Sequence, residues 1–159
     1  MITPLAACLG RATLSNSAWF CDQLITFLAI GDHTDGQFSL LRVRGGHGAE
    51  MAPHYHTHED ETIYLLEGEL TVLAGAVDLR LSPGDVVTIP RGLRHAVRHD
   101  SGAVAFLLHY SPAGFERYFH ELSEPAEYLG RPPQPTRPDP TLAAATAARY
   151  GCVVTETRA

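Results

Sequence analysis

Short apolar runs, each ended by glycine, proline or other turn residues, recur along the middle of the chain. The first such run, LITFLAI at 24–30, is followed by the turn residues GDHTDG at 31–36. Further runs follow at close intervals, at 37–43, 61–67, 70–74, 77–81, 85–89, 94–98 and 103–110. Many short strands joined by Gly and Pro turns predict an all-β sandwich or barrel. No long helical period interrupts 24–110, which disfavours a parallel βαβ sheet.

The C-terminal third has a different pattern. Segment 112–122 opens with proline and repeats apolar residues at helical spacing, at Phe115, Tyr118, Phe119 and Leu122. Segment 130–140 is dense in proline and predicts an extended connector. Asp139 before Pro140 is typical of a helix start, and Gly151 ends the alanine-rich run that follows. Two short helices are therefore predicted after the strands.

Length and composition indicate one soluble domain. The chain has 159 residues, of which 45% are hydrophobic and 19% charged, so it can bury a core without disulfides or metals. We expect an N-terminal arm at 1–23, a barrel at 24–111 and a helical tail with a Pro-rich connector at 112–159. No apolar stretch approaches the roughly 20 residues that span a bilayer, so no membrane association is expected.

The charge pattern excludes several partners and mechanisms. The formal net charge is -6, and all 12 basic residues are arginines scattered along the chain. An acidic chain without a basic patch argues against nucleic acid as a partner. The absence of lysine also excludes Schiff-base chemistry.

The cysteines and the N-terminus favour the cytoplasm. Cys8, Cys21 and Cys152 lack metal-site spacing and predict buried free thiols in a reducing compartment. The start MITPLAACLGR resembles a lipoprotein cleavage box, but no positive or long apolar region precedes Cys8. A signal peptide is therefore not expected.

Histidines are unusually frequent in one part of the sequence. Six of the nine fall within 47–99. His54, His56 and His58 alternate, and alternate side chains of a strand share one face, so a neighbouring pair can hold one cation. His58 could replace His54 in that pair if the register differs. Glu61 begins the next predicted strand and can reach the same ion.

A second segment completes the candidate metal site. His95 follows a tight P-R-G turn and begins another strand. Together with Glu61 and the histidine pair it makes a set of three imidazoles and one carboxylate. Such a set suits Fe, Mn, Co, Ni, Cu or Zn rather than Ca or Mg. H-x-H alone arises by chance, but the carboxylate, the flanking glycines and the second segment coincide here and favour one divalent transition metal.

Both segments resemble the two motifs of the cupin family. The first, G-x5-H-x-H-x4-E-x6-G, is matched by Gly48, His54, His56, Glu61 and Gly68. The second, G-x5-P-x-G-x2-H-x3-N, is matched by Gly84, Pro90, Gly92 and His95, with His99 in place of the final Asn. The resemblance implies a small double-stranded β-helix, a jelly-roll barrel. It also implies that the metal ligands are His54, His56, Glu61 and His95.

A narrower resemblance covers nearly all of 19–154. The runs LITFLAIGDHTDGQFSLL, PHYHTHEDETIYLLEGEL and SPAGFERYFHEL look like the single-domain quercetin 2,3-dioxygenase-like cupins, as does the tail. One fold hosts many chemistries, so this resemblance supports the fold more than the reaction. Cupins of this kind commonly pair through sheet edges, which implies a homodimer.

Other polar residues near the motifs have structural interpretations. His58 is expected to be exposed or to support a ligand, and His99 to point inward and form hydrogen bonds. His109 is expected in the core or the pocket wall, whereas Arg42 and Arg44 fit a solvated strand face. Candidate pocket-wall residues, which are also plain core candidates, are Phe38, Leu40, Met51, Tyr64, Phe106 and Leu108.

These features predict a mononuclear metal dioxygenase that acts on a flavonol-like or polyketide-like aromatic molecule with O2. Glu61 would be both ligand and catalytic base. One alternative is a cupin without redox chemistry, such as a polyketide cyclase or isomerase, in which Zn acts as a Lewis acid. Another is a binding module without turnover, although no helix-turn-helix segment marks a self-contained regulator.

Overall fold

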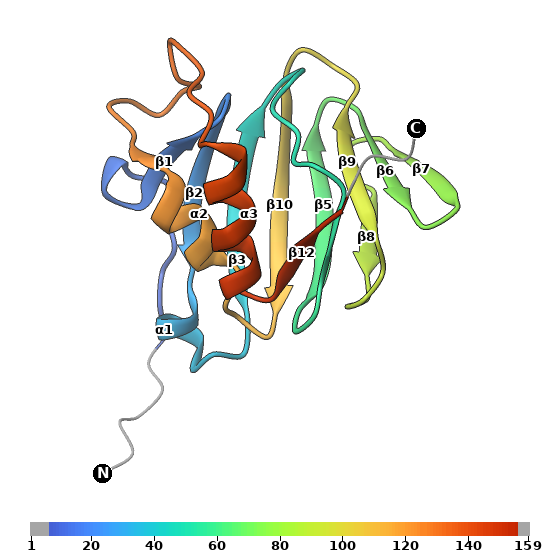
Figure 1. Cartoon of the computed structure of the whole chain (residues 1–159). Coiled ribbons are helices and arrows are strands. Elements are labelled where there is room, and N and C mark those ends of the chain that lie inside the picture. Colours follow the sequence, from blue (N-terminus) through green and yellow to red (C-terminus); the bar gives the residue numbers. More distant parts are fainter. Residues whose placement is uncertain (1–6, 156–159) are drawn as a thin grey trace.

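Two antiparallel β-sheets face each other and form a barrel in the computed structural model, which describes residues 7–155 (Figure 1). Residues 1–6, part of the segment considered above as a leader, and residues 156–159 lie outside the described part. The larger sheet contains, in spatial order, β11 (Glu124–Pro125), β1 (Ser17–Phe20), β2 (Gln23–Ala29), β3 (Ser39–Gly45), β10 (Val104–Ser111), β5 (Asp60–Glu67) and β8 (Val86–Ile89).

The smaller sheet carries the histidine-rich strands. Its strands, in spatial order, are β12 (Cys152–Val154), β4 (His54–His56), β9 (His95–His99), β6 (Leu70–Ala74) and β7 (Val77–Leu81). The three-residue strand β4 pairs with β12 along its whole length but with β9 only at His54 opposite His95. The backbone beneath His54 and His56 is therefore held mainly by the C-terminal strand.

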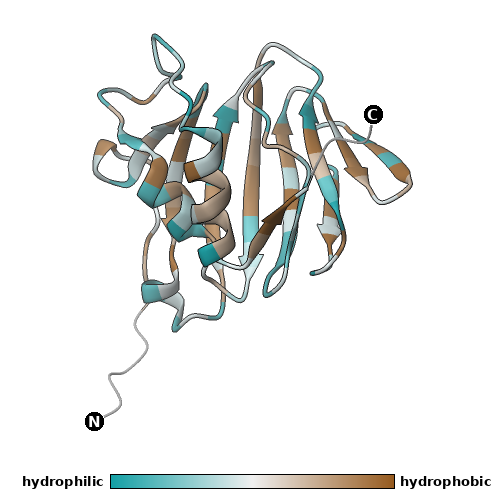
Figure 2. Cartoon of the chain, in the orientation of Figure 1, coloured by the Kyte–Doolittle hydropathy of each residue, from teal (hydrophilic) through white to brown (hydrophobic). Residues whose placement is uncertain are grey.

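Alternation of apolar and polar residues explains how the sheets close on a core. Along β3, Leu41 and Val43 are buried, while Arg44 is exposed. Apolar segments lie along the strands and polar or neutral ones in the loops (Figure 2). Period-two alternation turns one face of each strand inward, so the barrel interior is apolar except where a strand places a histidine or carboxylate there.

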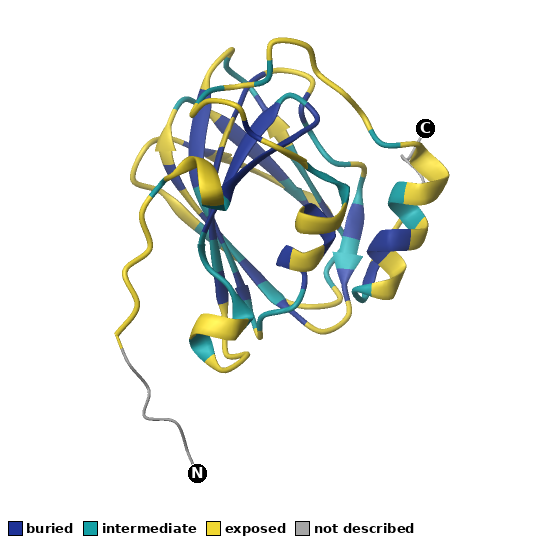
Figure 3. Cartoon of the chain, turned by 90° about the vertical axis from the view of Figure 1, so that its left-hand side faces the viewer, coloured by how far each residue is buried: buried dark blue, intermediate teal, exposed yellow. Residues whose placement is uncertain are grey.

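Three helices flank the sheets: α1 (Gly31–Thr34), α2 (Glu116–Leu122) and α3 (Pro140–Arg149). A 3-10 turn, η1 (Leu14–Asn16), precedes β1. The view in Figure 3 places α2 across the opening between the sheets and α3 outside the barrel. Helix α2 packs its aromatic residues into the core, and the side chain of Asp139 caps α3 by accepting from the Leu142 amide. Both C-terminal helices confirm the predicted pattern.

The structure adds elements that the apolar pattern does not show. Strands β1, β11 and β12 come from outside the predicted barrel segment and pair with strands of the two sheets. The turn predicted at 31–36 contains the short helix α1. Cys21 and Cys152 are buried and free as predicted, whereas Cys8 is exposed, because it lies on the irregular N-terminal segment. Among residues 7–155, no helix has the length and apolar character needed to cross a membrane.

Candidate metal centre

Four side chains from three strands converge inside the barrel. His54 and His56 alternate on β4 and so share its inner face, while Glu61 comes from β5 and His95 from β9. One potential ligand atom from each lies within 4.8 Å of the others. All four residues are buried, with exposed fractions of 1–4%. The structure thus brings together the four side chains predicted from the two motifs.

Backbone carbonyls set the ring orientation of two of these histidines. The Nδ1 of His54 donates to the carbonyl of Ala52 at 2.8 Å, and the Nδ1 of His95 to that of Leu93 at 3.0 Å. A carbonyl oxygen only accepts, so the proton of each ring sits on Nδ1. The Nε2 lone pair is therefore left for the centre of the cluster, the arrangement that metal-binding histidines show.

Glu61 contacts two of the histidines, His56 by a hydrogen bond and His95 by a close ion-pair contact. Its Oε2 lies 3.0 Å from His56 Nε2 and 3.3 Å from His95 Nε2. Burial alone would raise the pKa of Glu61, but hydrogen bonds and charge from the two histidines hold it below its usual value. The pKa of His95 is raised, because this carboxylate outweighs the effect of burial. Burial lowers the pKa of His54 to about 4, so its ring is neutral at pH 7.

A second buried carboxylate stands behind His56. Glu59 is 3% exposed, and its Oε2 lies 3.7 Å from the Nδ1 of His56. Neither atom has a hydrogen-bond partner among the described residues. Burial raises the pKa of Glu59. If His56 offered its Nε2 lone pair to a cation, its proton would move to Nδ1, where Glu59 is the nearest acceptor.

The cluster therefore fits a transition-metal ion. Its donors are three imidazole nitrogens and one carboxylate oxygen, a set that suits Fe, Mn, Co, Ni, Cu or Zn. The Nε2 of His95 is buried and lacks a well-aligned partner, as expected of a lone pair directed at a cation site. The unpaired Nδ1 of His56 and the nearby Glu59 carboxylate supply the outer support that such ligands require.

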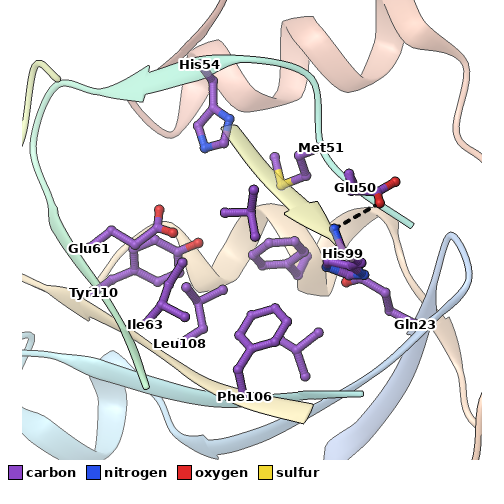
Figure 4. A pocket seen from close by; sticks show the side chains of 13 residues that line it. Gln23, Glu50, Met51, His54, Glu61, Ile63, His99, Phe106, Leu108 and Tyr110 are labelled. Atoms are coloured by element: carbon purple, nitrogen blue, oxygen red, sulfur yellow. Dashed lines mark hydrogen bonds between the residues drawn. The ribbon is translucent and has the colours of Figure 1, made fainter. Parts of the chain in front are cut away.

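An internal cavity of about 40 Å³ begins at this cluster and runs between the sheets (Figure 4). Glu61 and Tyr110 lie on one side of it, and His99, Glu50 and Gln23 on the opposite side. The apolar side chains that line it come from both sheets, the 46–53 segment and α2: Val43, Met51, Ile63, Val97, Phe106, Leu108 and Phe119. A ligand in this space would meet the metal candidates at one end and polar groups at the other.

His99 anchors the segment that closes this far end. Its Nδ1 donates to the carbonyl of Gly46 at 2.8 Å, and its carbonyl accepts from the Nδ1 of His47 at 2.9 Å. Its amide donates to Glu50 Oε1 at 3.1 Å. Burial lowers the pKa of His99. The histidine that replaces the Asn of the second motif thus points inward and forms hydrogen bonds, as predicted.

The remaining predicted residues separate into inner and outer faces. His58 is exposed, contacts Thr57 and lies outside the cluster, as expected for a non-ligand. The prediction that His109 lies in the core or pocket wall is wrong. It alternates with the inward-facing Leu108 and stacks on the outer side against Phe38, with ring centroids 5.4 Å apart. Met51, Phe106 and Leu108 line the cavity, whereas Phe38, Leu40 and Tyr64 do not.

Several residues of the site were not predicted from the sequence. Gln23 lies outside both histidine segments, and Glu50 stands four residues before His54 in a stretch without helix or strand, so only the folded chain shows that both line the cavity. Glu59 carries a signal that could have been used, because it stands two residues before Glu61 in the run HEDE. Arg44 is exposed and Arg42 half-buried, in line with an outward strand face.

Comparison with known proteins defines the class. The Cupin domain family matches residues 41–110, which include both histidine segments. A solved RmlC-like cupin from Shewanella frigidimarina superposes with a TM-score of 0.59 at 18% identity, covering 70% of this chain and 96% of that one. The protein belongs to the cupin superfamily, and its two sheets form the jelly-roll double-stranded β-helix of that superfamily.

Two curated relatives narrow the comparison. Quercetin 2,3-dioxygenase of Bacillus subtilis (strain 168) is 35% identical over 106 residues, which cover 67% of this chain and 32% of the relative. The tetracenomycin polyketide synthase protein TcmJ of Streptomyces glaucescens is 33% identical over 52 residues, covering 33% of this chain and 35% of the relative. The matches thus span about a third of the length of each relative.

Proposed function

We propose that this cupin is a metal-dependent dioxygenase acting on a flavonol-like or polyketide-like aromatic molecule. The carrying observation is the buried cluster of three histidines and one glutamate at the end of an apolar cavity. The likeness to a quercetin 2,3-dioxygenase supports the choice of reaction. We assign the metal-ligand role to His54, His56, Glu61 and His95.

A bound transition metal would supply Lewis acidity and, if redox-active, the means to use O2. The chain supplies the surroundings. Backbone carbonyls hold His54 and His95 with Nε2 inward, and apolar walls exclude water around the reacting group. In this proposal Glu61 takes the proton from a substrate hydroxyl. Its lowered pKa keeps it ionised, so it is able to bind a cation or to accept a proton.

A second candidate is a reaction without O2, such as polyketide cyclisation or isomerisation. The match to a protein named for a tetracenomycin polyketide synthase favours it. The same ligands could hold Zn, and the same cavity could orient the substrate. This candidate differs from the first in one observable, the consumption of oxygen.

Metal analysis followed by oxygen uptake tests the proposal. Protein purified with each of Fe, Mn, Co, Ni, Cu and Zn is expected to bind one ion per chain and, with a redox-active metal, to consume O2 when a flavonol is added. Full-speed turnover under anaerobic conditions would favour the cyclase or isomerase. Tight flavonol binding with no product under either condition would indicate a binding module. Light scattering would test the homodimer that we also propose.

A further inference from the structure

The cavity is too small for the substrate class proposed above. Its volume of about 40 Å³ is enough for a few waters, since one water needs roughly 10–15 Å³ by this measure. Pockets that bind drug-sized molecules measure roughly 300–1,000 Å³. An aromatic substrate that reaches the metal candidates must therefore extend beyond the cavity.

A larger hollow lies on the other side of the cavity wall. This outer groove has a volume of about 430 Å³, within the range of a ligand pocket. It is formed by the start of α3, the Pro-rich connector, α2, β1 and the segment around Met51. Its lining residues are Phe20, Cys21, Glu50, Met51, Ala52, Tyr118, Arg137, Pro138, Asp139, Pro140, Ala143, Ala144 and Val154.

Glu50 and Met51 line both hollows, so these two residues form part of the wall between them. Glu50 is held by the His99 amide, and the preceding residue, Ala49, accepts from Gln23 through its carbonyl at 2.6 Å. Met51 lies in a stretch without helix or strand, and its thioether forms no hydrogen bond among the described residues. Methionine is unbranched and changes rotamer readily, which makes it the movable part of the wall.

We propose that the outer groove is the second half of the substrate site, joined to the cavity when the Met51 side chain moves aside. The inference rests on the proposed function. It specifies an aromatic ligand whose metal-binding edge lies at Glu61 and whose remaining ring occupies the groove between Tyr118 and α3. The groove continues the cavity through shared residues, which is why we assign it to the substrate rather than to another chain.

The charges of the groove favour a hydrogen-bond acceptor at the far end of that ligand. Asp139 already accepts from the Leu142 amide, and Glu50 accepts from the His99 amide. Arg137 has no hydrogen bond or ion pair among the described residues. Its guanidinium is therefore available to donate to a phenolic or carbonyl oxygen.

A pair of probes with the same chelating edge tests the assignment. Maltol and 3-hydroxyflavone both carry a hydroxyl next to a ring ketone, but only the flavone extends beyond it. Both are titrated into zinc-loaded protein by calorimetry. Ala144→Trp fills the groove, and Ala145→Trp on the exposed side of the same helix is the matched control. Ala144→Trp should weaken flavone binding by about tenfold or more and leave maltol unchanged.

A second variant avoids dependence on a bulky substitution. Met51→Ala removes the wall side chain and should speed flavone association at least severalfold, with zinc content unchanged. Unchanged flavone affinity in Ala144→Trp would overturn the groove assignment. A change in the oligomeric state of Ala144→Trp would also overturn it, because the groove would then be a contact between subunits. Failure of both probes to bind the parent protein would instead contradict the proposed function, and the groove assignment with it.

Discussion

His95 and His99 occupy nearly equivalent positions at the two ends of β9. Both face the barrel interior, both are almost fully buried, and each donates its Nδ1 proton to a backbone carbonyl. Yet the pKa of His95 is raised while that of His99 is lowered. Burial lowers both, but at His95 the Glu61 carboxylate outweighs it, whereas Glu50 binds the backbone of His99 rather than its ring. On β9, therefore, the nearby Glu61 carboxylate gives these two buried histidines opposite pKa shifts.

Removal of the ring at the ligand end should have the largest effect. His95→Ala deletes one of four donors, so metal affinity should fall by more than about 100-fold and activity should be lost. The barrel should stay folded, because its strands carry their own apolar core. Elemental analysis and circular dichroism give the two readouts. His58→Ala is the control, since His58 is exposed and outside the cluster. An equal loss of metal in that control would contradict the ligand assignment.

Glu61→Gln tests the carboxylate that lies beside His95 and not beside His99. The change keeps the size of the side chain but removes its charge and basicity. If Glu61 is the base, turnover of metal-replete protein should fall by about 10²–10⁴-fold, more than metal affinity does. Steady-state rates at matched metal content provide the measurement. Loss of rate in proportion to loss of metal would show that Glu61 only ligates.

Glu59→Gln tests whether metal binding by His56 depends on the buried carboxylate behind its ring. Metal affinity should fall by roughly 10–100-fold, as for other outer-shell partners of metal-binding histidines. The metal-free protein should become more stable at neutral pH. The pKa of Glu59 is raised on folding, so its charged form opposes folding as the pH rises above the unfolded value. Competition with a chelator and urea unfolding measure the two effects. A parallel loss of stability and affinity would point to a purely structural role.

His99→Asn should have the smallest effect, and on stability rather than metal. It removes the ring contact to Gly46, which should cost about 1–3 kcal/mol and leave one ion per chain. The pKa of His99 is lowered from 6.5, so the unfolded chain binds the extra proton first as the pH falls below that value. This part of the stability is present above pH 6.5 and is lost below it.

The variant should therefore lose less stability between about pH 7.5 and 5.5 than the parent protein does. Urea unfolding at several pH values checks this slope. An identical slope in both proteins would mean that His99 binds protons equally in the folded and unfolded chains, contrary to the lowered pKa of the folded state.

Much of the fold follows from local patterns. Runs at 70–74 and 77–81 coincide with β6 and β7, and the Asp139–Pro140 signal marks the start of α3. Strands β11 and β12 did not stand out, because they are two and three residues long and their pairing partners lie far away in sequence. Such strands exist through tertiary pairing, which no local apolar pattern reports.

The four candidate ligands could be predicted from the sequence. Their spacing is local within each segment, and the alternation of a strand fixes which side chains share a face. The opposite wall of the cavity was not accessible. Gln23, Glu50 and Phe119 come from three separate parts of the chain, and only closure of the barrel brings them together. The prediction for His109 was wrong because a place in the core or pocket wall requires the inner face of β10. His109 lies on the outer face of that strand.

The pairing of β4 with β12 has a consequence for the order of events during biosynthesis. His95, the last of the four candidate ligands in sequence, leaves the ribosome about 60 residues before Val154. At roughly 5–20 residues per second, several seconds pass in which every ligand has been made but β4 lacks its main partner. The candidate ligands are thus all synthesised before β4 can pair along its length with β12, so we expect the complete cluster to form only after β12 has docked.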